Sequence, residues 1–490
     1  MGGGADRKGE TRRLIAGPFN RVEGDLEVRL TIERDQVVAA HVNSPLFRGF
    51  EAILAGKDPR DALTIVPRIC GICSVSQSMA AQHALAELQG IAPPPNGLLA
   101  QAVVHAAENL ADHLIHFHVF FMADFARQIY APRPWFEEVH ELFAAKTGTA
   151  VRAAIEARAT LFHVMGILAG KWPHTLSLQP GGVTKAPDAR DRMRLLATVR
   201  QFRAFCEKQL FGAPLEEVAA LETADALQAF AETGGPAYAK TYLRIARDLD
   251  LHDAGLGPPR LMSFGGYRLP DETVFGPGLL RDGRKEEIDF SAIAEDLSHS
   301  WMLGEAAHPA RGETVPDPQM CEPGYSWCKA PRLTGETVEV GAIARQANDG
   351  HPLALAMLRD GRANVHGRIV GRLLEIARLV PAMESWVRAM DVSEPFILHP
   401  RRIEDGAARG LAEAARGSLG HWVTVEKGRI AHYQIVAPTT WNFSPRDATG
   451  APGPLEAALE GAPVLRGETT PVSVQHIVRS FDPCMVCTVH

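Results

Sequence analysis

Two pairs of cysteines lie near opposite ends of this chain, and they constrain its fold more than any other feature. The first pair is Cys70 and Cys73, and the second is Cys484 and Cys487. Four thiolates in two such pairs can enclose a thiophilic metal. Zinc ribbons and related modules place their pairs within about twenty residues of each other, whereas nearly the whole chain separates these two. The complete fold must therefore assemble the site, which is more typical of a catalytic or cofactor centre than of a structural one.

Size and composition limit the classes of protein to which the chain can belong. With 490 residues, 46% of them hydrophobic, it can bury a large core. Its net charge of -7 provides no basic surface for nucleic acid or an anionic membrane. No apolar run reaches the roughly 18 to 20 residues of a spanning helix, because Glu108, Asp112 and Asp124 interrupt the most apolar region. We therefore expect no nucleic-acid partner and no membrane span.

The three remaining cysteines favour a reducing compartment. Cys206, Cys321 and Cys328 are odd in number, which argues against a disulfide framework. We expect Cys321 and Cys328 to be free, buried thiols. The pair Arg12-Arg13 precedes an apolar stretch that is too short for a twin-arginine export signal. These features predict a cytoplasmic protein, with a mobile end over residues 1–13.

Hydrophobic periodicity predicts long helices and short hairpins. Leu26 to Ile32 alternate as a strand that returns over Val37 to Val42, and a second hairpin over Val423 to Tyr433 turns at Lys427-Gly428. The predicted helices begin near Ser74 and cover 97–130 with Asn96 as N-cap, 151–170, 190–211, and 352–390 with a break near Gly361 and a kink near Pro381.

The predicted elements divide the chain into five regions of one integrated unit. They are an N-terminal α+β region with the first cysteine pair (1–95), a long-helix region (96–250), a loop and strand-rich region (251–345), a helical region (346–395) and a C-terminal α+β region with the second pair (396–490).

The motifs around the cysteines resemble those of a known family. The early motif is Arg68-Ile69-Cys70-Gly71-Ile72-Cys73, and the last is Asp482-Pro483-Cys484-Met485-Val486-Cys487-Thr488-Val489-His490. Together with the segments 20–24 and 413–422, they are similar to the large subunit of a nickel–iron hydrogenase, and the likeness spans the chain. The resemblance implies a mainly α fold with α+β portions, in which a bundle of long helices carries small peripheral sheets.

The same resemblance implies a nickel–iron centre that cleaves H2 into protons and electrons. Cys70 and Cys484 would bind nickel alone, and Cys73 and Cys487 would bridge nickel to iron. Two cyanides and one carbon monoxide would complete the coordination of the iron, and maturation proteins must supply them. Iron–sulfur clusters would lie only on a small subunit, an obligate partner in a heterodimer or in a dimer of heterodimers, because no further cluster motif is present.

Further residues receive roles by the same resemblance. Glu23 matches the carboxylate that takes protons from Cys484, and Arg416 matches a guanidinium above the metals that Asp112 and Asp482 orient. From the residues alone, Glu23 could be a solvated carboxylate and Arg416 could pair with a surface acid.

A magnesium site is also implied. Glu51, the backbone carbonyl of Ile435 and His490 match its ligands, and hard oxygen donors suit that ion. We expect His174 to be a buried, hydrogen-bonded histidine and not a metal ligand.

Three features favour a regulatory hydrogen sensor of low turnover that signals to a histidine kinase. Gln77 stands where the family usually carries histidine. Ile72 and Phe120 stand where catalytic relatives usually carry smaller residues at the inner end of the gas route, which predicts oxygen tolerance. The chain ends at His490 without the extension that catalytic relatives have cleaved.

Three alternatives stay open at this point. The first is an energy-conserving uptake hydrogenase, the second is a thioredoxin-type redox pair at Cys70 and Cys73, and the third is a non-catalytic protein with a four-cysteine zinc site. Metal analysis separates zinc from nickel with iron.

Overall fold

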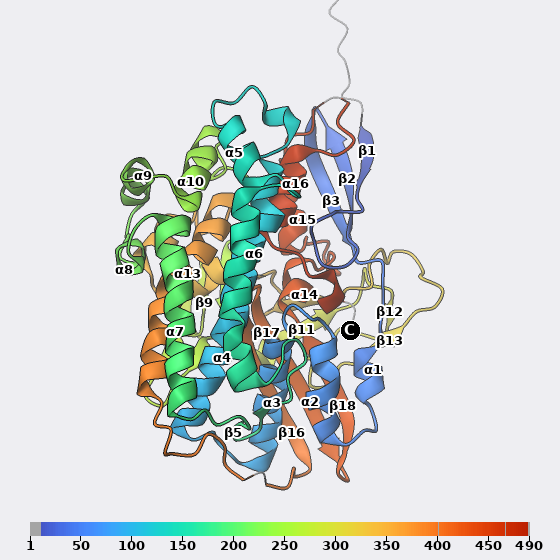
Figure 1. Ribbon diagram of the computed structural model, residues 1–490. Helices are drawn as coiled ribbons and strands as arrows, with labels where there is room; N and C mark the ends of the chain where they lie inside the picture. The colour runs from blue at the N-terminus through green and yellow to red at the C-terminus, as the bar shows by residue number, and fades with distance from the viewer. Residues whose placement is uncertain (1–10, 400, 466, 489–490) are drawn as a thin grey trace, which may run out of the picture.

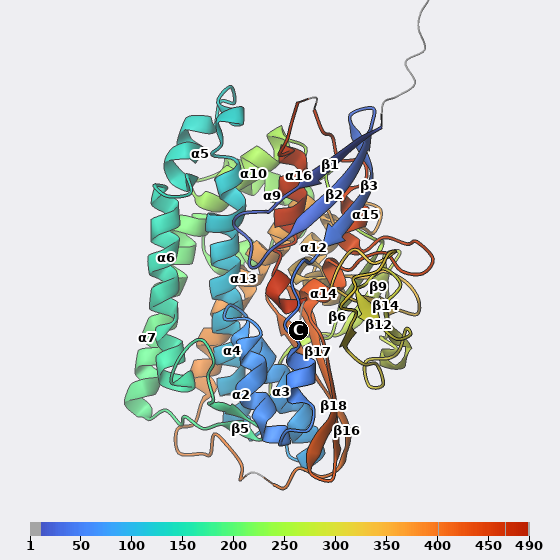
Figure 2. The ribbon, with the colours of Figure 1, turned by 90° about the vertical axis from the view of Figure 1, so that its right-hand side faces the viewer.

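Long helices that run side by side form the body of the molecule (Figures 1 and 2). The computed structural model describes residues 11–399, 401–465 and 467–488. The long helices are α4 (Pro95–Ile115), α6 (Thr149–Leu161), α7 (Ala189–Phe205) and α13 (Val365–Ala389). Helix α13 packs against α4 and α7, and α6 packs against the same two helices. Together with the small sheets around them, these helices confirm the predicted fold class.

The other helices connect and cover this bundle. They are α1 (Phe50–Leu54), α2 (Ala62–Ile65), α3 (Ser74–Gln89), α5 (Phe136–Phe143), α8 (Leu215–Ala219), α9 (Ala224–Glu232), α10 (Tyr238–Asp248), α11 (Ala342–Asn348), α12 (Pro352–Ala356), α14 (Pro438–Asn442), α15 (Pro454–Leu459) and α16 (Val472–Ser480). Helix α3 begins at the predicted Ser74. The predicted break near Gly361 separates α12 from α13, and Pro381 lies inside α13.

Two antiparallel three-stranded sheets lie at the periphery, and both predicted hairpins are confirmed. The first sheet contains β1 (Arg12–Ala16), β2 (Glu27–Glu33) and β3 (Gln36–Asn43), and the second contains β16 (Gly406–Ala414), β17 (Gly417–Glu426) and β18 (Arg429–Val436). Strand β1 was not predicted, since Arg12 and Arg13 were assigned to a mobile end. Their pairing with β2 provides the order that the local sequence does not indicate.

The remaining strands are short and lie mostly in the loop-rich middle of the chain. One four-stranded sheet has the order β10-β9-β6-β15, from β6 (Arg260–Ser263), β9 (Gly278–Arg281), β10 (Arg284–Glu286) and β15 (Glu339–Val340). The two-stranded pairs are β4 (Leu178–Gln179) with β5 (Gly182–Val183), β7 (Gly266–Arg268) with β8 (Thr273–Phe275), β11 (Ile293–Asp296) with β14 (Ala330–Leu333), and β12 (Met302–Leu303) with β13 (Val315–Pro316).

The predicted helix over 97–130 is wrong in its bounds and in its cap. Helix α4 begins at Pro95, whose fixed φ suits a first helical turn. It widens into a π-helical turn over His116–Phe121 and ends in a 3-10 turn over Met122–Asp124. Asn96 lies inside the helix, where its Oδ1 accepts a hydrogen bond from Asp391 N at 3.0 Å. The helices predicted over 151–170 and 190–211 end similarly in π-helical turns.

The sheet β16–β18 and helix α3 hold the first cysteine pair against the interior. Gly410 on β16 lies so close to α3 that an added Cβ would meet the Ala80 carbonyl oxygen at 1.7 Å. Only glycine permits this approach. The C-terminal segment also lies inside the molecule, since Asp482, Cys484 and Cys487 are buried.

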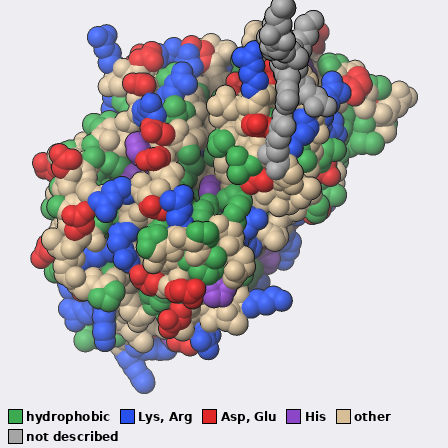
Figure 3. All heavy atoms as spheres, turned by 90° about the horizontal axis from the view of Figure 1, so that it is seen from above, with side chains coloured by type: hydrophobic (Ala, Val, Ile, Leu, Met, Phe, Trp, Pro, Cys, Tyr) green, Lys and Arg blue, Asp and Glu red, His purple; other side chains and the backbone are tan. Residues whose placement is uncertain are grey.

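Charges are dispersed over the face seen in Figure 3, where acidic and basic side chains intersperse with apolar ones. None of the helices in the described ranges combines the length and the apolar character that a bilayer crossing requires.

Candidate metal centre

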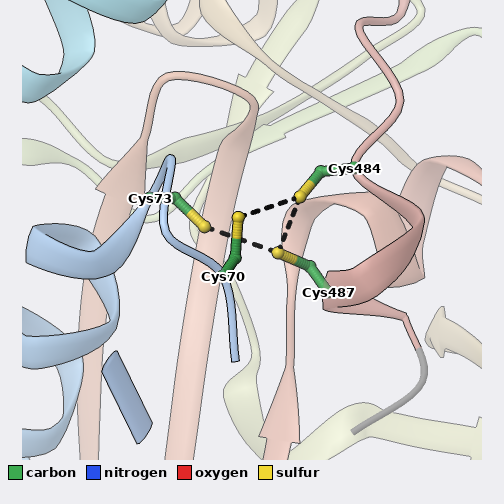
Figure 4. A group of neighbouring side chains, drawn as sticks. All are labelled: Cys70, Cys73, Cys484 and Cys487. Carbon is green, nitrogen blue, oxygen red and sulfur yellow. Dashed lines mark hydrogen bonds between the residues drawn. The ribbon is translucent and has the colours of Figure 1, made fainter. Parts of the chain in front are cut away.

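The two cysteine pairs meet in the interior, as Figure 4 shows. Their four sulfur atoms all lie within 4.8 Å of one another, and all four residues are buried. The Sγ–Sγ distances are 3.3 Å from Cys70 to Cys484, 3.4 Å from Cys73 to Cys487 and 3.0 Å from Cys484 to Cys487. This compact set of soft donors fits a thiophilic transition metal.

Two turns present the cysteines. Cys70 and Cys73 lie between a 3-10 turn (Val66–Arg68) and α3, and Cys73 directly precedes the first residue of α3. Cys484 and Cys487 follow α16, around a 3-10 turn over Met485–Cys487. Each pair therefore lies beside a helix end, and the two pairs face each other.

The crowding of the sulfurs changes their acidity. Hydrogen bonds from Cys484 and the other thiols lower the pKa of Cys70 well below its ordinary value. Similar contacts raise the pKa of Cys73 and Cys484. Metal binding at these thiols would release protons, because the thiolate is the ligand.

Glu23 lies beside this cluster because its backbone pairs with the C-terminal motif. Glu23 N donates to Pro483 O at 3.3 Å, and Met485 N donates to Glu23 O at 2.7 Å. Gly24 follows with φ +78°, where an added Cβ would meet Val486 N at 3.0 Å. Burial and the neighbouring Cys70 raise the pKa of Glu23, whereas Arg416 lowers it. Glu23 is half-buried beside the thiols, in the position of a group that could exchange protons with them.

Arg416 is buried and paired, and does not reach a surface acid. It follows Ala415 in the turn between β16 and β17. Its Nη2 donates to Asp482 Oδ1 at 2.9 Å and its Nε to Asp482 O at 2.8 Å. Its Nη1 also donates to Asp112 on α4. Burial alone would lower the pKa of Arg416, but Asp112 and Asp482 raise it well above its ordinary value. Burial raises the pKa of Asp112 to about 6 although Arg416 opposes this shift.

Glu51 and Ile435, two of the predicted magnesium ligands, are in contact through the Ile435 N–H. Glu51 Oε1 accepts from Ile435 N at 2.8 Å, and Thr314 donates to the other carboxylate oxygen. Gln434 adds a buried amide that contacts Thr314 and Lys329. The third predicted ligand, His490, lies outside the described residues.

Of the residues that favoured a sensor, Ile72 and Gln77 adjoin the first cysteine pair in the chain, whereas Phe120 lies in the π-helical turn after α4. Gln77 Oε1 is 2.8 Å from His421 Nε2, and His421 Nδ1 is 2.8 Å from the Tyr433 hydroxyl. Ile72 packs against the core but is only partly buried. Phe120 is also partly buried, and its carbonyl accepts a hydrogen bond from Arg21 at 2.9 Å.

Two predictions need correction. Cys321 is exposed, so it is a free thiol but not a buried one, whereas Cys328 and Cys206 are buried as free thiols. Cys321 lies in a loop after β13, outside the apolar core. His174 makes the expected hydrogen bond, with its Nδ1 3.0 Å from Pro67 O, but it is only partly buried.

Three residues that hold the site were not assigned by sequence reasoning. Arg48 donates to Val486 O at 2.7 Å and to Ile69 O, and so joins the two cysteine segments. Arg372 donates to the carbonyls of Ser480 and Phe481 just before the second pair. Glu108 binds the first turn of α3. A carboxylate in an otherwise apolar helix was the available signal for Glu108.

Fold and site together define a class of protein in which both ends of the chain bring cysteines into one buried cluster that could hold a metal. A family model described as nickel-dependent hydrogenase matches residues 48–133 and 149–490. The chain belongs to the nickel-dependent hydrogenase family, it has the large-subunit fold of that family, and it is a hydrogenase, an oxidoreductase that acts on H2.

Curated relatives cover almost the whole chain. It is 29% identical to the periplasmic NiFeSe hydrogenase large subunit of Desulfomicrobium baculatum, over 98% of this chain and 95% of that protein. It is 26% identical to the uptake hydrogenase large subunit of Afipia carboxidovorans, over 98% and 95% respectively. The solved NiFeSe hydrogenase of Dm. baculatum superimposes with a TM-score of 0.84 at 27% identity, over 98% of this chain and 100% of the other.

Proposed function

We propose that this hydrogenase large subunit is a regulatory hydrogen sensor built around a nickel–iron centre with two cyanides and one carbon monoxide on iron. The observation that carries the metal assignment is the compact, buried set of four sulfurs contributed by both ends of the chain. Four soft thiolates favour nickel and iron over hard cations. Structural zinc would not need a buried Arg416 held between Asp112 and Asp482 beside the thiols.

Each cysteine has a proposed place. Cys70 and Cys484 would bind nickel, and Cys73 and Cys487 would bind both nickel and iron. When bound, the centre polarises H2 and takes up its electrons. The Cys484 sulfur holds the released proton and passes it to Glu23, whose backbone is paired with Cys484. Arg416 provides a fixed positive charge in a dry site, where preorganised electrostatics act strongly.

Magnesium is proposed near the second pair. The Glu51 carboxylate, the Ile435 carbonyl and His490 would hold it, since hard oxygen donors suit this ion. The contact between Glu51 and the Ile435 backbone supports this site.

Electrons must leave through another chain. In the described residues, the four cysteines of the centre are the only group that could hold a metal cluster. We therefore propose an obligate small subunit that carries the iron–sulfur clusters, in a heterodimer or a dimer of heterodimers. A histidine kinase would read the sensor state. A cytoplasmic location is supported by the seven cysteines, none of which forms a disulfide.

The sensor role rests on Gln77, Ile72 and Phe120. The second candidate is an uptake hydrogenase, which the match to an uptake hydrogenase large subunit favours. Measuring H2 turnover and hydrogen-dependent kinase phosphorylation in the purified complex separates the two. High turnover without any kinase response would overturn the sensor role and leave the metal assignment intact.

The metal assignment is tested on the matured complex. We expect about one nickel per chain and infrared bands of iron-bound carbon monoxide and cyanide. Cys484→Ser should lose nickel, because a hydroxyl is a poor ligand for a soft metal, while Cys206→Ser, a buried thiol far from the cluster in sequence, should retain it. Zinc alone in the wild-type protein would sink the proposal.

A further inference from the structure

Glu108 is a fully buried carboxylate that five donors surround. It lies on α4 with 2% of its surface exposed. Val75 N donates to it at 2.8 Å, Ser76 N at 2.9 Å and Trp172 Nε1 at 3.0 Å. The hydroxyls of Ser76 and Ser74 lie at 3.1 and 3.3 Å. A buried carboxylate needs such donors because desolvation of its charge is costly.

Two of these donors are backbone N–H groups of the first turn of α3, so Glu108 binds the start of that helix. The residue that precedes α3 is Cys73, and it provides no side-chain hydrogen bond to the free N–H groups of the first turn. An ordinary N-cap side chain accepts from one of the second or third helical residues. Glu108 accepts from both, Val75 and Ser76, and it does so from a different helix. Its carboxylate also lies at the positive end of the α3 dipole, which favours the ionised form.

Helix α4, which carries Glu108, also carries Asp112, the partner of Arg416. Asp112 follows Glu108 by four residues, so both carboxylates project from one face of α4. Asp112 binds Arg416, and Glu108 binds the turn that carries Cys73. One turn of a rigid helix therefore sets the position of the first cysteine pair relative to Arg416.

A third segment meets the same carboxylate. Trp172 and His174 belong to a partly exposed loop. His174 N donates to Ser74 Oγ at 3.4 Å, and Trp172 donates to Glu108 directly. Pro173 between them packs over Gly71, where an added Cβ would lie 3.8 Å from its ring. The loop thus covers the first cysteine turn and depends on Glu108 for its position.

We propose that Glu108 is a positioning residue of the metal centre: it caps α3 from α4 and thereby fixes Cys70 and Cys73 relative to Arg416 and the loop 170–174. This inference rests on the proposed nickel–iron centre but not on the sensor role. It does not give Glu108 contact with substrate or metal.

Glu108→Gln keeps the shape of the side chain but turns an NH2 group toward a backbone N–H. The matched control is Glu456→Gln. Glu456 is equally buried, accepts from Val42 N at 2.9 Å and Gly453 N at 3.3 Å, and also binds the Tyr325 hydroxyl. Burial raises the pKa of both Glu108 and Glu456 to about 7. Glu456 also lies 3.9 Å from Arg446 but has no contact with either cysteine turn among its hydrogen bonds, so it reports on the loss of a buried carboxylate away from the metal centre.

The matured complex gives two readouts. Amide hydrogen exchange of Val75 and Ser76 should be about tenfold faster in Glu108→Gln than in the wild type, as expected when one hydrogen bond is lost. The infrared band of iron-bound carbon monoxide should shift and broaden. In Glu456→Gln both readouts should match the wild type. A Glu108→Gln complex that keeps wild-type exchange and an unchanged infrared band would overturn the proposal.

Milder variants keep the test decisive if Glu108→Gln does not mature. Trp172→Phe and Ser76→Ala each remove one donor and leave the carboxylate in place. Each should displace the infrared band in the same direction by a smaller amount, and unchanged bands in both would reject the role of Glu108. Absence of carbon monoxide bands in the wild type would instead refute the metal centre, while the exchange readout would still test the helix cap.

Discussion

Arg48→Met removes the side chain that joins the two cysteine segments, and we expect it to weaken nickel retention. Arg48 Nη2 donates to Val486 O at 2.7 Å and also to Ile69 O. These acceptors belong to turns that are far apart in sequence and that each carry one cysteine pair. Methionine keeps much of the apolar stem but cannot donate. The two turns then lose their direct link and can separate more easily.

The expected size follows from the bonds that are lost. A hydrogen bond from a charged group contributes about 1.5–3 kcal/mol. Arg48 is only half-buried, so the lower end applies, and the two bonds together contribute about 3 kcal/mol. If this energy holds the turns in the metal-binding arrangement, its loss lowers nickel affinity about 100-fold.

The assay is nickel release from the matured complex during incubation with a chelator, followed by elemental analysis. Arg60→Met is the matched control, because Arg60 forms an exposed pair with Asp58 on the same region of the chain. We expect the control to retain nickel as the wild type does. If a folded Arg48→Met complex also releases nickel at the wild-type rate, then the bridge between the turns does not hold the metal.

Three further outcomes follow from the structure. Gly24→Ala places a side chain on a left-handed backbone at φ +78° and against Val486, and the backbone alone costs about 1–2 kcal/mol. Because Gly24 follows Glu23, the hydrogen–deuterium exchange that the complex catalyses should slow. An unchanged rate would show that the Gly24 contact does not position the proton acceptor. The double change Ile72→Val with Phe120→Leu should shorten the survival of activity in air while anaerobic activity persists, and equal survival would exclude tunnel width as the cause. His118→Phe should reduce the loss of unfolding free energy at acid pH. Burial lowers the pKa of His118 to about 4, so the unfolded chain binds more protons than the folded chain between about pH 6.5 and 4. In denaturant titrations at pH 5, the wild type should therefore lose about 2 kcal/mol of unfolding free energy that the variant keeps.

Local sequence patterns identified those helices and strands whose boundaries are set by residues a few positions apart. The start of α3 at Ser74 and the two hairpins follow from alternation and turn residues, and the turn residues Arg34, Asp35 and Lys427 do adopt positive φ. Residue chemistry likewise identified the four thiols as a soft donor set. The overall fold class came from the resemblance of the motifs, because periodicity alone does not specify how helices pack.

Other structural features depend on contacts between segments that are far apart in the sequence. The end of α4 as a π-helical turn could not be read from an apolar pattern that continues past Ile115. Arg21, from the first sheet's connection, binds the Phe120 carbonyl within that turn. The burial of Cys321 was also misjudged, because the exposure of a loop depends on what packs over it.

The sequence therefore identifies the cysteines that would bind the metal, whereas the tertiary structure determines where they lie relative to one another and to their neighbours. Glu23 lies beside Cys484 through backbone pairing, Arg48 joins the two cysteine turns, and Glu108 caps a helix from another helix. Each contact joins side chains or backbone groups that no local periodicity connects. Their donors and acceptors gain energy only when the folded chain brings them together in its buried interior.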